Sequence, residues 1–235
     1  MIAACVQENL HYNRAHIFVI TPQFIPQIFA LANPFASTDS NIASWFHAHL
    51  TPAFVTLLRV LCEPGASEFV AVVLVALIAF FVWKRQWPAI VTVIIAVPGG
   101  MLLNELVKIL VHRHRPFVDG PFVDWEGYSF ASGHTIGATL LWGQLLLFAL
   151  PLIRSRRVRR ILICAAAAIV LLVGFGRVAL GAHYLTDVVA AMLFGSGWLA
   201  FCGFVAKPMR RRELAVVPVI VEASSSERPQ GMTAS

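Results

Sequence analysis

The chain has 235 residues, of which 58% are hydrophobic and only 13% are charged, and its mean hydropathy is +0.76. This composition is too apolar for an ordinary soluble domain and indicates a protein of the lipid bilayer. The formal net charge is +6, but the basic residues form short clusters beside apolar runs, a pattern that argues for membrane topology and against a nucleic-acid surface.

The four cysteines give no sign of a disulfide framework or of a zinc site. Cys5, Cys62, Cys164 and Cys202 show no paired spacing, and the last two lie inside apolar runs. The N-terminus lacks a charged start followed by an apolar run with a small-residue cleavage site, so we expect no cleavable signal peptide. Insertion is then expected to rely on the membrane spans themselves.

The N-terminal part of the chain gives only a weak membrane signal. Residues 1–37 form an N-terminal segment whose candidate span, Ala15 to Ala32, contains prolines and glutamines for which lipid offers no hydrogen-bond partners. From Thr38 to Cys62, apolar residues recur at helical spacing among polar ones. This spacing predicts a helix that lies in the membrane interface, within a segment bounded at 38–64.

Further along the chain, five runs meet or approach the length of about 20 apolar residues that a helix needs to cross the hydrocarbon core. The first is a little short unless it extends back to Gly65. They are Phe69 to Trp83, Trp87 to Val107, Thr135 to Ile153, Ile161 to Leu180, and Tyr184 to Ala206. With the weak first span they predict an all-α, polytopic six-helix transmembrane bundle, whose catalytic domain covers residues 65–212. Residues 213–235 are predicted to be a mobile C-terminal tail.

Lys and Arg clusters lie at three alternate junctions between the spans, at residues 84–85, 154–160 and 207–212. If each run crosses the membrane once, all three fall on one side, which the bias of cytoplasmic loops toward Lys and Arg makes the cytoplasm. Residues 108–134 and the connection around Gly181 then lie on the extracytoplasmic face of the bacterial plasma (inner) membrane. Contact with anionic lipid headgroups is the alternative interpretation of the arginine cluster.

The first pattern on the outer face consists of Lys108 and Arg115-Pro116. If the helix continues past Lys108, Arg115 lies seven positions on and almost on the same face, and Pro116 ends the helix. Two cations would then converge on one point. The alternative is an ion pair between Glu105 and Lys108 at the bilayer edge, with Arg115 reaching into solvent.

The second pattern is Ser132-Gly133-His134. Ser132 is a suitable N-cap directly before the run that begins at Thr135, and Gly133 allows close approach of the backbone. The first free N–H groups of such a helix form an anion site. The motif alone is equally consistent with a capped helix that has His134 at the interface.

The third pattern combines Arg177, His183 and Asp187. His183 and Asp187 are four residues apart at the start of the last span, so the carboxylate can accept a hydrogen bond from one ring nitrogen and raise the basicity of the other. Arg177 precedes His183 across an expected tight turn at Gly181. A structural His and Asp pair is the alternative.

Together the three patterns supply what phosphoryl transfer needs. The reaction depends on positioning and on cations that clamp the phosphate oxygens, a task for Lys108, Arg115 and Arg177 with the N–H groups of the second pattern. It also needs a nucleophile and a proton donor. The imidazoles of His183 and His134 fit these two tasks.

In order and spacing, these patterns resemble the three-part signature of the type 2 phosphatidic acid phosphatase family. The matching motifs are Lys108-x6-Arg115-Pro116, Ser132-Gly133-His134 and Arg177-x5-His183-x3-Asp187. The resemblance implies a phosphatidic acid phosphatase type 2/haloperoxidase-like core, a phosphohistidine at His183 with Asp187 as its partner, and His134 as the acid. The residues that would hold the phosphate are Lys108, Arg115, Ser132, Gly133 and Arg177.

Two positions depart from the family pattern. Ala131 stands where the family usually has proline before Ser-Gly-His, and Gly176 stands where it usually has serine before the arginine. Both changes would loosen the phosphate pocket, but neither removes a catalytic group.

We therefore expect a membrane-embedded lipid phosphate phosphatase that hydrolyses a phosphomonoester or diphosphate through a phosphohistidine intermediate, as part of phospholipid metabolism. Phosphatidic acid, phosphatidylglycerophosphate and a polyprenyl diphosphate fit equally. Membrane lipids are expected partners, nucleic acid is not, and no oligomeric state is predicted. No metal or other cofactor is expected, because Lys and Arg side chains would repel a cation from the site.

Three alternatives to hydrolysis stay open at this point. An anion transporter would be favoured by broken spans in paired halves, and Pro98-Gly99-Gly100 is one such candidate break. A non-catalytic membrane scaffold and a phosphotransferase of the same family are the others.

Overall fold

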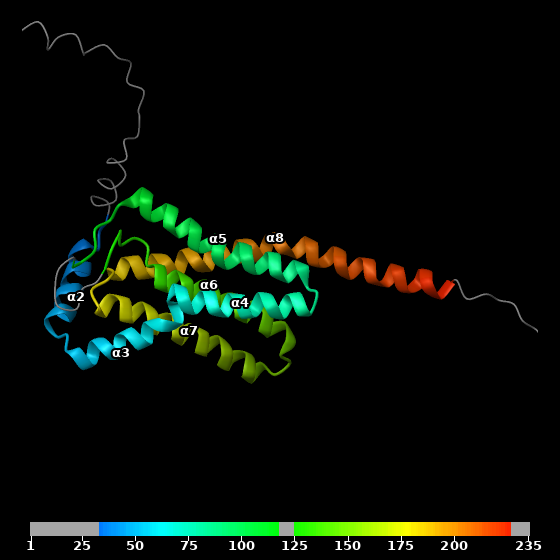
Figure 1. Cartoon of the computed structure of the whole chain (residues 1–235), viewed down its shortest axis with the longest axis horizontal. Coiled ribbons are helices and arrows are strands. Elements are labelled where there is room, and N and C mark those ends of the chain that lie inside the picture. The colour runs from blue at the N-terminus through cyan, green and yellow to red at the C-terminus, as the bar shows by residue number, and fades with distance from the viewer. Residues whose placement is uncertain (1–32, 118–124, 227–235) are drawn as a thin grey trace, which may run out of the picture.

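The structure, a computed structural model, describes residues 33–117 and 125–226, with side chains described as far as residue 205. Within these ranges it is helical, without strands, as the predicted all-α class requires. The helices are α2 (Ala36–Ala48), α3 (Pro52–Cys62), α4 (Ser67–Trp83), α5 (Trp87–Val111), α6 (Gly133–Ala149), α7 (Arg156–Ala179) and α8 (Leu185–Ser226), with 3-10 turns η1 (Glu63–Gly65) and η2 (Leu150–Leu152) (Figure 1). The weak first span, Ala15 to Ala32, lies outside the described residues.

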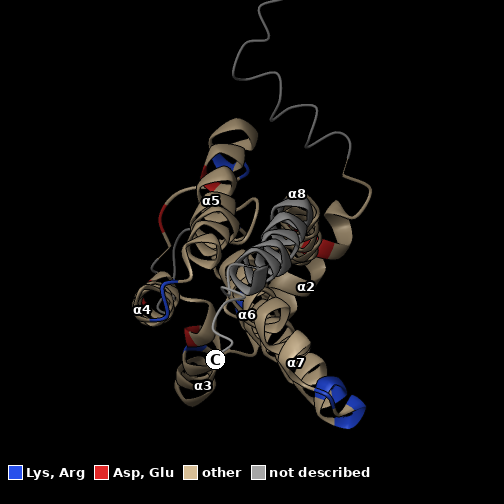
Figure 2. Ribbon diagram, turned by 90° about the vertical axis from the view of Figure 1, so that its right-hand side faces the viewer, with Lys and Arg blue, Asp and Glu red and all other residues tan. Residues whose placement is uncertain are grey.

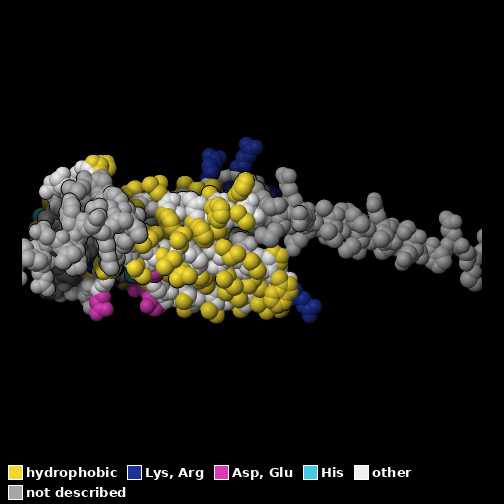
Figure 3. All heavy atoms as spheres, turned by 90° about the horizontal axis from the view of Figure 1, so that it is seen from above, with side chains coloured by type: hydrophobic (Ala, Val, Ile, Leu, Met, Phe, Trp, Pro, Cys, Tyr) yellow, Lys and Arg dark blue, Asp and Glu magenta, His cyan; other side chains and the backbone are white. Residues whose placement is uncertain are grey.

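Five of the described helical segments are long and apolar enough to cross a membrane. They are Pro52–Trp83, Trp87–Val111, Gly133–Leu152, Arg156–Ala179 and Leu185–Val205. All five predicted strong spans fall within these segments or overlap them closely. Figure 3 shows apolar side chains spread over the middle of the molecule on the face in view. Val72, Leu102 and Leu193 are among the exposed large apolar residues of the described part of the chain. An apolar exterior of this extent is typical of an integral membrane protein.

The segment from Thr38 to Cys62 is not the single helix that the sequence predicted. It forms α2 and α3, which are separated at residues 49–51. Thr51 begins α3, because its hydroxyl accepts the N–H of Phe54 (3.4 Å) and Pro52 occupies the first helical turn. The prediction of one helix was therefore wrong, and the interfacial location of this segment stays a prediction.

The predicted break at Pro98 is also absent, since α5 runs through this residue. The indole N–H of Trp198 on α8 donates to the carbonyls of Ile95 (3.3 Å) and Ala96 (3.0 Å), in the turn that precedes the proline. A proline inside a helix frees the carbonyl four residues before it, here that of Ile94. Trp198 binds the two carbonyls that follow Ile94, so α8 supports α5 next to the freed group. α5 is therefore not a broken span, and the feature of this helix that would have favoured an anion transporter is absent.

The last helix is longer than its predicted span. α8 extends from Leu185 to Ser226, so residues 213–226 are helical where a mobile tail was predicted. The part of α8 as far as Val205 is the candidate membrane span. The mobility of the tail stays a prediction, and residues 227–235 lie outside the described residues.

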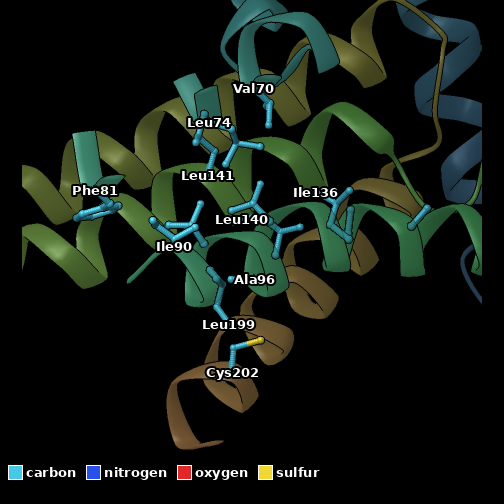
Figure 4. Packing of buried hydrophobic residues seen from close by; sticks show 14 residues of the cluster. Val70, Leu74, Phe81, Ile90, Ala96, Ile136, Leu140, Leu141, Leu199 and Cys202 are labelled. Carbon is cyan, nitrogen blue, oxygen red and sulfur yellow. The ribbon is translucent and has the colours of Figure 1, made fainter. Parts of the chain in front are cut away.

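α6 lies at the centre of the bundle and packs against α5, α7 and α8 (Figure 1). Its side chains Ile136, Leu140 and Leu141 are fully buried, and Figure 4 shows them in contact range of residues from α4, α5 and α8. A helix that is apolar all round is typical of such a buried position. The central packing fixes the N-terminus of α6, which carries two of the predicted site residues.

The two ends of the bundle differ in the residues that they carry. The C-terminal ends of α5 and α7 and the N-terminal ends of α6 and α8 lie at the same end, on the left in Figure 1. The junctions with Lys84, Arg85 and the cluster Arg154 to Arg160 lie at the other end, and these side chains are exposed. Figure 2 shows Lys and Arg positions in blue at the tip of α7. The alternation predicted from the charge pattern is confirmed, whereas the assignment of the basic end to the cytoplasm stays a prediction.

Candidate active site

A cavity of about 210 Å³ opens at the end of the bundle opposite the basic junctions. Residues from all three predicted motifs line it. The full lining consists of Ser67, Met101, Asn104, Glu105, Lys108, Arg115, Gly133, His134, Ile136, Arg177 and His183. Six of the eight predicted site residues are therefore brought together. The other two, Ser132 and Asp187, lie behind the cavity wall.

Ser132 occupies the predicted N-cap position of α6, but its side chain makes no capping hydrogen bond. The residue is fully buried, and its hydroxyl accepts a hydrogen bond from the Thr135 hydroxyl (3.0 Å). Its backbone N–H donates to the carbonyl of Asp187 (3.4 Å). Ser132 thus joins α6 to α8, and the cavity-facing part of the motif is Gly133 and His134.

Lys108 and Arg115 reach the cavity from different elements. α5 ends at Val111, and His112 takes a left-handed conformation with φ of 50°, so the predicted continuous helix as far as Arg115 was wrong. The alternative ion pair does form, with Lys108 Nζ 2.6 Å from Glu105 Oε1. Lys108 nevertheless lines the cavity, so the ion pair and the contact with a phosphate are compatible.

Arg115 does not extend into solvent. Its guanidinium donates to three backbone carbonyls, those of Glu126 (2.8 Å), Ala182 (3.0 Å) and Gly127 (3.1 Å). Nη1 also lies 3.4 Å from Nε2 of His183. The first and third motifs, far apart in the sequence, thus meet at one point, as predicted.

Arg177 is buried at the end of α7, with 6% of its surface exposed. The guanidinium carbon lies 4.5 Å from the centre of the Trp125 ring, a cation–π contact. Among the described residues, Nε of Arg177 has no hydrogen-bond partner. The stacked ring holds the cation at the cavity wall, where Nε can donate to an anion.

The departure at Gly176 has a structural reason. A Cβ atom at this position would lie 2.6 Å from Sγ of Cys62 and 3.4 Å from the carbonyl oxygen of Leu58, both on α3. The glycine therefore allows α3 to pack directly against α7, and the Cys62 thiol occupies space that a serine would need. Glycine in place of serine at position 176 therefore brings α3 and α7 into contact and does not loosen the phosphate pocket.

His183 lies in the turn between α7 and α8, whereas the prediction placed it at the start of the last helix. Gly181 has φ of 70°, which forms the expected tight turn. The imidazole is 2% exposed, and its Nδ1 lies 2.7 Å from the carbonyl oxygen of Ser129, whereas the Asp187 carboxylate is 3.8 Å away. The prediction that Asp187 accepts this hydrogen bond was wrong, because the Ser129 carbonyl holds the position.

The contact with Ser129 defines the tautomer of His183. A carbonyl oxygen can only accept, so Nδ1 carries the hydrogen and Nε2 keeps its lone pair on the side of Arg115. Burial lowers the pKa of His183 to about 4, Arg177 and Arg115 act in the same direction, and Asp187 opposes them. The imidazole is therefore neutral at pH 7, the form that a nucleophile requires.

Asp187 is fully buried and supports the site indirectly. Its carboxylate accepts hydrogen bonds from the Ser129 hydroxyl, from the Tyr184 N–H (2.9 Å) and from Arg113, with which it forms an ion pair. Arg113 also forms an ion pair with Asp39 of α2 (2.8 Å). The sequence did not point to Ser129 or Asp39, because neither stands at a motif spacing.

Two further polar residues of the cavity wall were missed. Ser67 begins α4, and Asn104 lies on α5 one turn before Lys108. Asn104 donates to the carbonyl of Ala131 (3.3 Å), and its own oxygen has no partner among the described residues. In the sequence an asparagine within an apolar run is a detectable signal, because such residues are costly in a membrane unless they serve a site.

Comparison with known proteins agrees with this geometry. The model of the PAP2 superfamily matches residues 87–208, which is more than half of the chain. The chain belongs to the PAP2 superfamily. Phosphatidylglycerophosphatase B of Bacillus subtilis (strain 168) is 31% identical to this PAP2 protein over 156 residues, covering 63% of this chain and 74% of the relative.

A solved structure gives the same result for the fold. It is described as the crystal structure of the first transmembrane PAP2 type phosphatidylglycerolphosphate phosphatase from Bacillus subtilis. It superposes with a TM-score of 0.66 at 25% identity, covering 82% of this chain and 96% of that chain. The resemblance seen in the motifs is thus confirmed, and this PAP2 protein is an integral membrane member of a phosphatase family.

Proposed function

We propose that this PAP2 protein hydrolyses the phosphate ester of a membrane lipid through a phosphohistidine on His183. The observation that carries the proposal is the environment of Nε2. Its lone pair lies beside the cavity, 3.4 Å from Nη1 of Arg115, while Nδ1 is fixed by Ser129. A neutral imidazole held in this tautomer beside a cationic cavity suits attack on a phosphoryl group.

In the first step, Nε2 of His183 attacks the phosphorus atom and the bond from phosphorus to the lipid oxygen breaks. Lys108, Arg115 and Arg177 face the same cavity and would stabilise the charge on the three equatorial oxygens. His134 lines the cavity from α6 and would donate a proton to the leaving oxygen. The products are the lipid alcohol and the phosphoenzyme.

In the second step, a water molecule attacks the phosphorus and the bond to Nε2 breaks. His134, now deprotonated, would take the proton of the water and return to its starting state. Inorganic phosphate leaves the cavity. Each proton and each bond is accounted for by these two histidines and water, so the scheme needs no metal ion.

The size of the cavity favours a lipid that inserts only its head. Sites that enclose a drug-sized ligand have volumes of about 300–1,000 Å³, which is more than this cavity offers. The acyl chains would therefore stay in the bilayer while the phosphate enters, at a site that we propose lies at the extracytoplasmic interface of the plasma membrane. The B. subtilis relatives carry phosphatidylglycerophosphate in their names, so this lipid is the first substrate to test.

The test is a phosphate-release assay of the purified protein with phosphatidylglycerophosphate, phosphatidic acid and a polyprenyl diphosphate, each in excess chelator. Release from phosphatidylglycerophosphate should be fastest and unaffected by the chelator. Quenched reactions should contain a phosphoenzyme that acid destroys and alkali preserves, as a phosphorus–nitrogen bond requires. No release from any lipid would refute the function, and loss of activity that added metal restores would refute the metal-free mechanism.

A further inference from the structure

Asp39 lies outside the signature motifs, yet its carboxylate is buried at the end of the bundle that holds the cavity. It stands in the first turn of α2, is 2% exposed, and precedes the residues 87–208 that the PAP2 model matches. A buried carboxylate is costly unless it is paired and hydrogen-bonded. The partners of Asp39 therefore indicate what this charge holds in place.

Asp39 binds two groups of other elements. Its Oδ1 accepts the backbone N–H of Thr186 (3.1 Å) and so caps the start of α8 from a different helix. Its Oδ2 accepts from the Thr186 hydroxyl and from Nη2 of Arg113 (2.8 Å). The carboxylate thus ties α2 both to α8 and to the loop that follows α5.

Arg113 connects Asp39 to Asp187. Its Nη1 donates to Asp187 and to the Thr186 hydroxyl (2.7 Å), and its guanidinium carbon lies 4.2 Å from the centre of the Tyr184 ring. The guanidinium is planar and presents its donors in fixed directions. The two carboxylates that it bridges are therefore held at a defined separation and orientation.

The connection continues to the nucleophile through Ser129. The hydroxyl of Ser129 donates to Asp187, its N–H donates to the carbonyl of Arg113 (2.8 Å), and its own carbonyl accepts from Nδ1 of His183 (2.7 Å). Ser129 is fully buried and held from both sides. The direction of its carbonyl sets the orientation of the imidazole.

We infer that Asp39 is a positioning residue, which acts through Arg113 to fix Asp187 and Ser129 so that Nε2 of His183 faces the cavity. The inference rests on the proposed function of His183. Asp39 does not line the cavity, so its replacement should leave lipid affinity unchanged. A misplacement of about 1 Å at a reacting group can lower the rate on the order of 10²-fold, so partial loosening should reduce kcat about tenfold.

The test compares Asp39→Asn with Glu68→Gln. Both replace a carboxylate by an amide in the first turn of a helix, but Glu68 is exposed on α4. Asp39→Asn should lower kcat about tenfold with KM unchanged, whereas Glu68→Gln should change neither. In addition, the acid limb of kcat/KM should move to lower pH in Asp39→Asn, because a displaced Asp187 carboxylate would raise the pKa of His183 less than it does in the wild-type protein.

A purely structural role of Asp39 would scale the whole pH profile down without moving its acid limb. That result, or an unchanged kcat, would overturn the inference while leaving the phosphatase function intact. If Asp39→Asn fails to fold, Thr186→Val removes the shared hydroxyl and keeps every charge. It should lower kcat about threefold, since one hydrogen bond contributes on the order of 1 kcal/mol, and an unchanged kcat would count against the inference.

The failure of the proposed function would be visible separately. If the wild-type protein releases no phosphate from any lipid, the function fails, and the orientation of His183 is then measured by its rate of modification with diethyl pyrocarbonate. This rate must change in Asp39→Asn and stay constant in Glu68→Gln. Equal rates in all three proteins would overturn the positioning role as well.

Discussion

The two ends of the bundle both carry clustered arginines, but the structure treats the clusters in opposite ways. At the cavity end, Arg177 is buried, and Arg113 and Arg115 are partly buried. Each of these three side chains contacts carboxylates, backbone carbonyls or an aromatic ring. At the other end, the cluster from Arg154 to Arg160 is exposed.

This difference shows that the role of an arginine depends on the groups around it and not on whether it belongs to a cluster of arginines. A buried guanidinium with fixed partners is held in one orientation, and the donors that its partners leave open can bind an anion of defined geometry. An exposed guanidinium is screened by salt, and its effect is on the topology of the chain in the membrane.

Replacement of the nucleophile should have the largest effect. His183→Ala should abolish phosphate release while the protein still inserts and folds, because no other described group presents a free imidazole lone pair beside Arg115. The matched control is His114→Ala, an exposed histidine in the loop after α5 that does not line the cavity. Full activity of the His183 variant in a phosphate-release assay would refute the mechanism.

Removal of a buried cation should have the next largest effect. Arg177→Ala should lower turnover on the order of 10²- to 10³-fold, as expected when one preorganised donor to a transition state is lost. The assay measures kcat/KM with the best lipid substrate, alongside size-exclusion chromatography to check folding. A loss of less than tenfold would show that Arg115 and Lys108 suffice and would weaken the comparison between the two ends.

The pH dependence of activity should report the burial of the nucleophile. Burial lowers the pKa of His183 to about 4, so the free enzyme keeps a neutral imidazole until the pH falls toward that value. The acid limb of kcat/KM assigned to His183 should therefore lie well below the ordinary histidine value of about 6.5, and at pH 5.5 little of the roughly tenfold loss expected for an ordinary histidine should occur. Samples returned to pH 7 must regain activity, and a limb near 6.5 would contradict the buried environment.

Restoring the usual family residue at position 176 should destabilise the protein. Gly176→Ser places atoms against Sγ of Cys62, and overpacking of this kind costs about 1–3 kcal/mol, so the thermal midpoint in detergent should fall. The double variant Cys62→Ala with Gly176→Ser should recover much of the loss. Equal destabilisation in the single and double variants would show that α3 does not occupy this space.

The smallest effect is expected at the exposed end of the same helix. Arg157→Ala should change kcat/KM by no more than about twofold, because exposed substitutions away from special features rarely exceed 0.5 kcal/mol. Arg157 and Arg177 both belong to α7, so the pair compares one residue type in two environments. If Arg157→Ala lowered kcat/KM as much as Arg177→Ala does, the two arginine clusters would not differ in their roles.

Much of the site could be predicted because the motifs have fixed spacings and stand at predictable ends of apolar helices. Alternate crossing of the membrane brings Lys108, His134 and Arg177 to one end whatever the details of packing. Asp39 and Ser129 could not be predicted in this way. They contact the site across distant stretches of chain, and neither belongs to a motif, although the sequence around Asp39 shows helical spacing.

The local backbone conformation was harder to predict than the set of residues that forms the site. The sequence suggested a helix that carries Lys108 and Arg115 on one face, but α5 ends at Val111. Arg115 reaches the cavity because three backbone carbonyls of the tertiary structure hold its guanidinium. Helix propensity does not predict these contacts, because the carbonyls are brought to Arg115 only by folding.

The sequence by itself determined the membrane location, the number of strong spans, the family and which end of the bundle would hold the reacting groups. These features depend on hydrophobic length and motif spacing, which are properties of the chain read in order. Only the tertiary structure decided which oxygen fixes Nδ1 of His183, why residue 176 is a glycine, and how Asp39 is linked to the nucleophile. Those depend on atoms that folding brings within about 3 Å of each other, the range over which hydrogen bonds and steric contacts act.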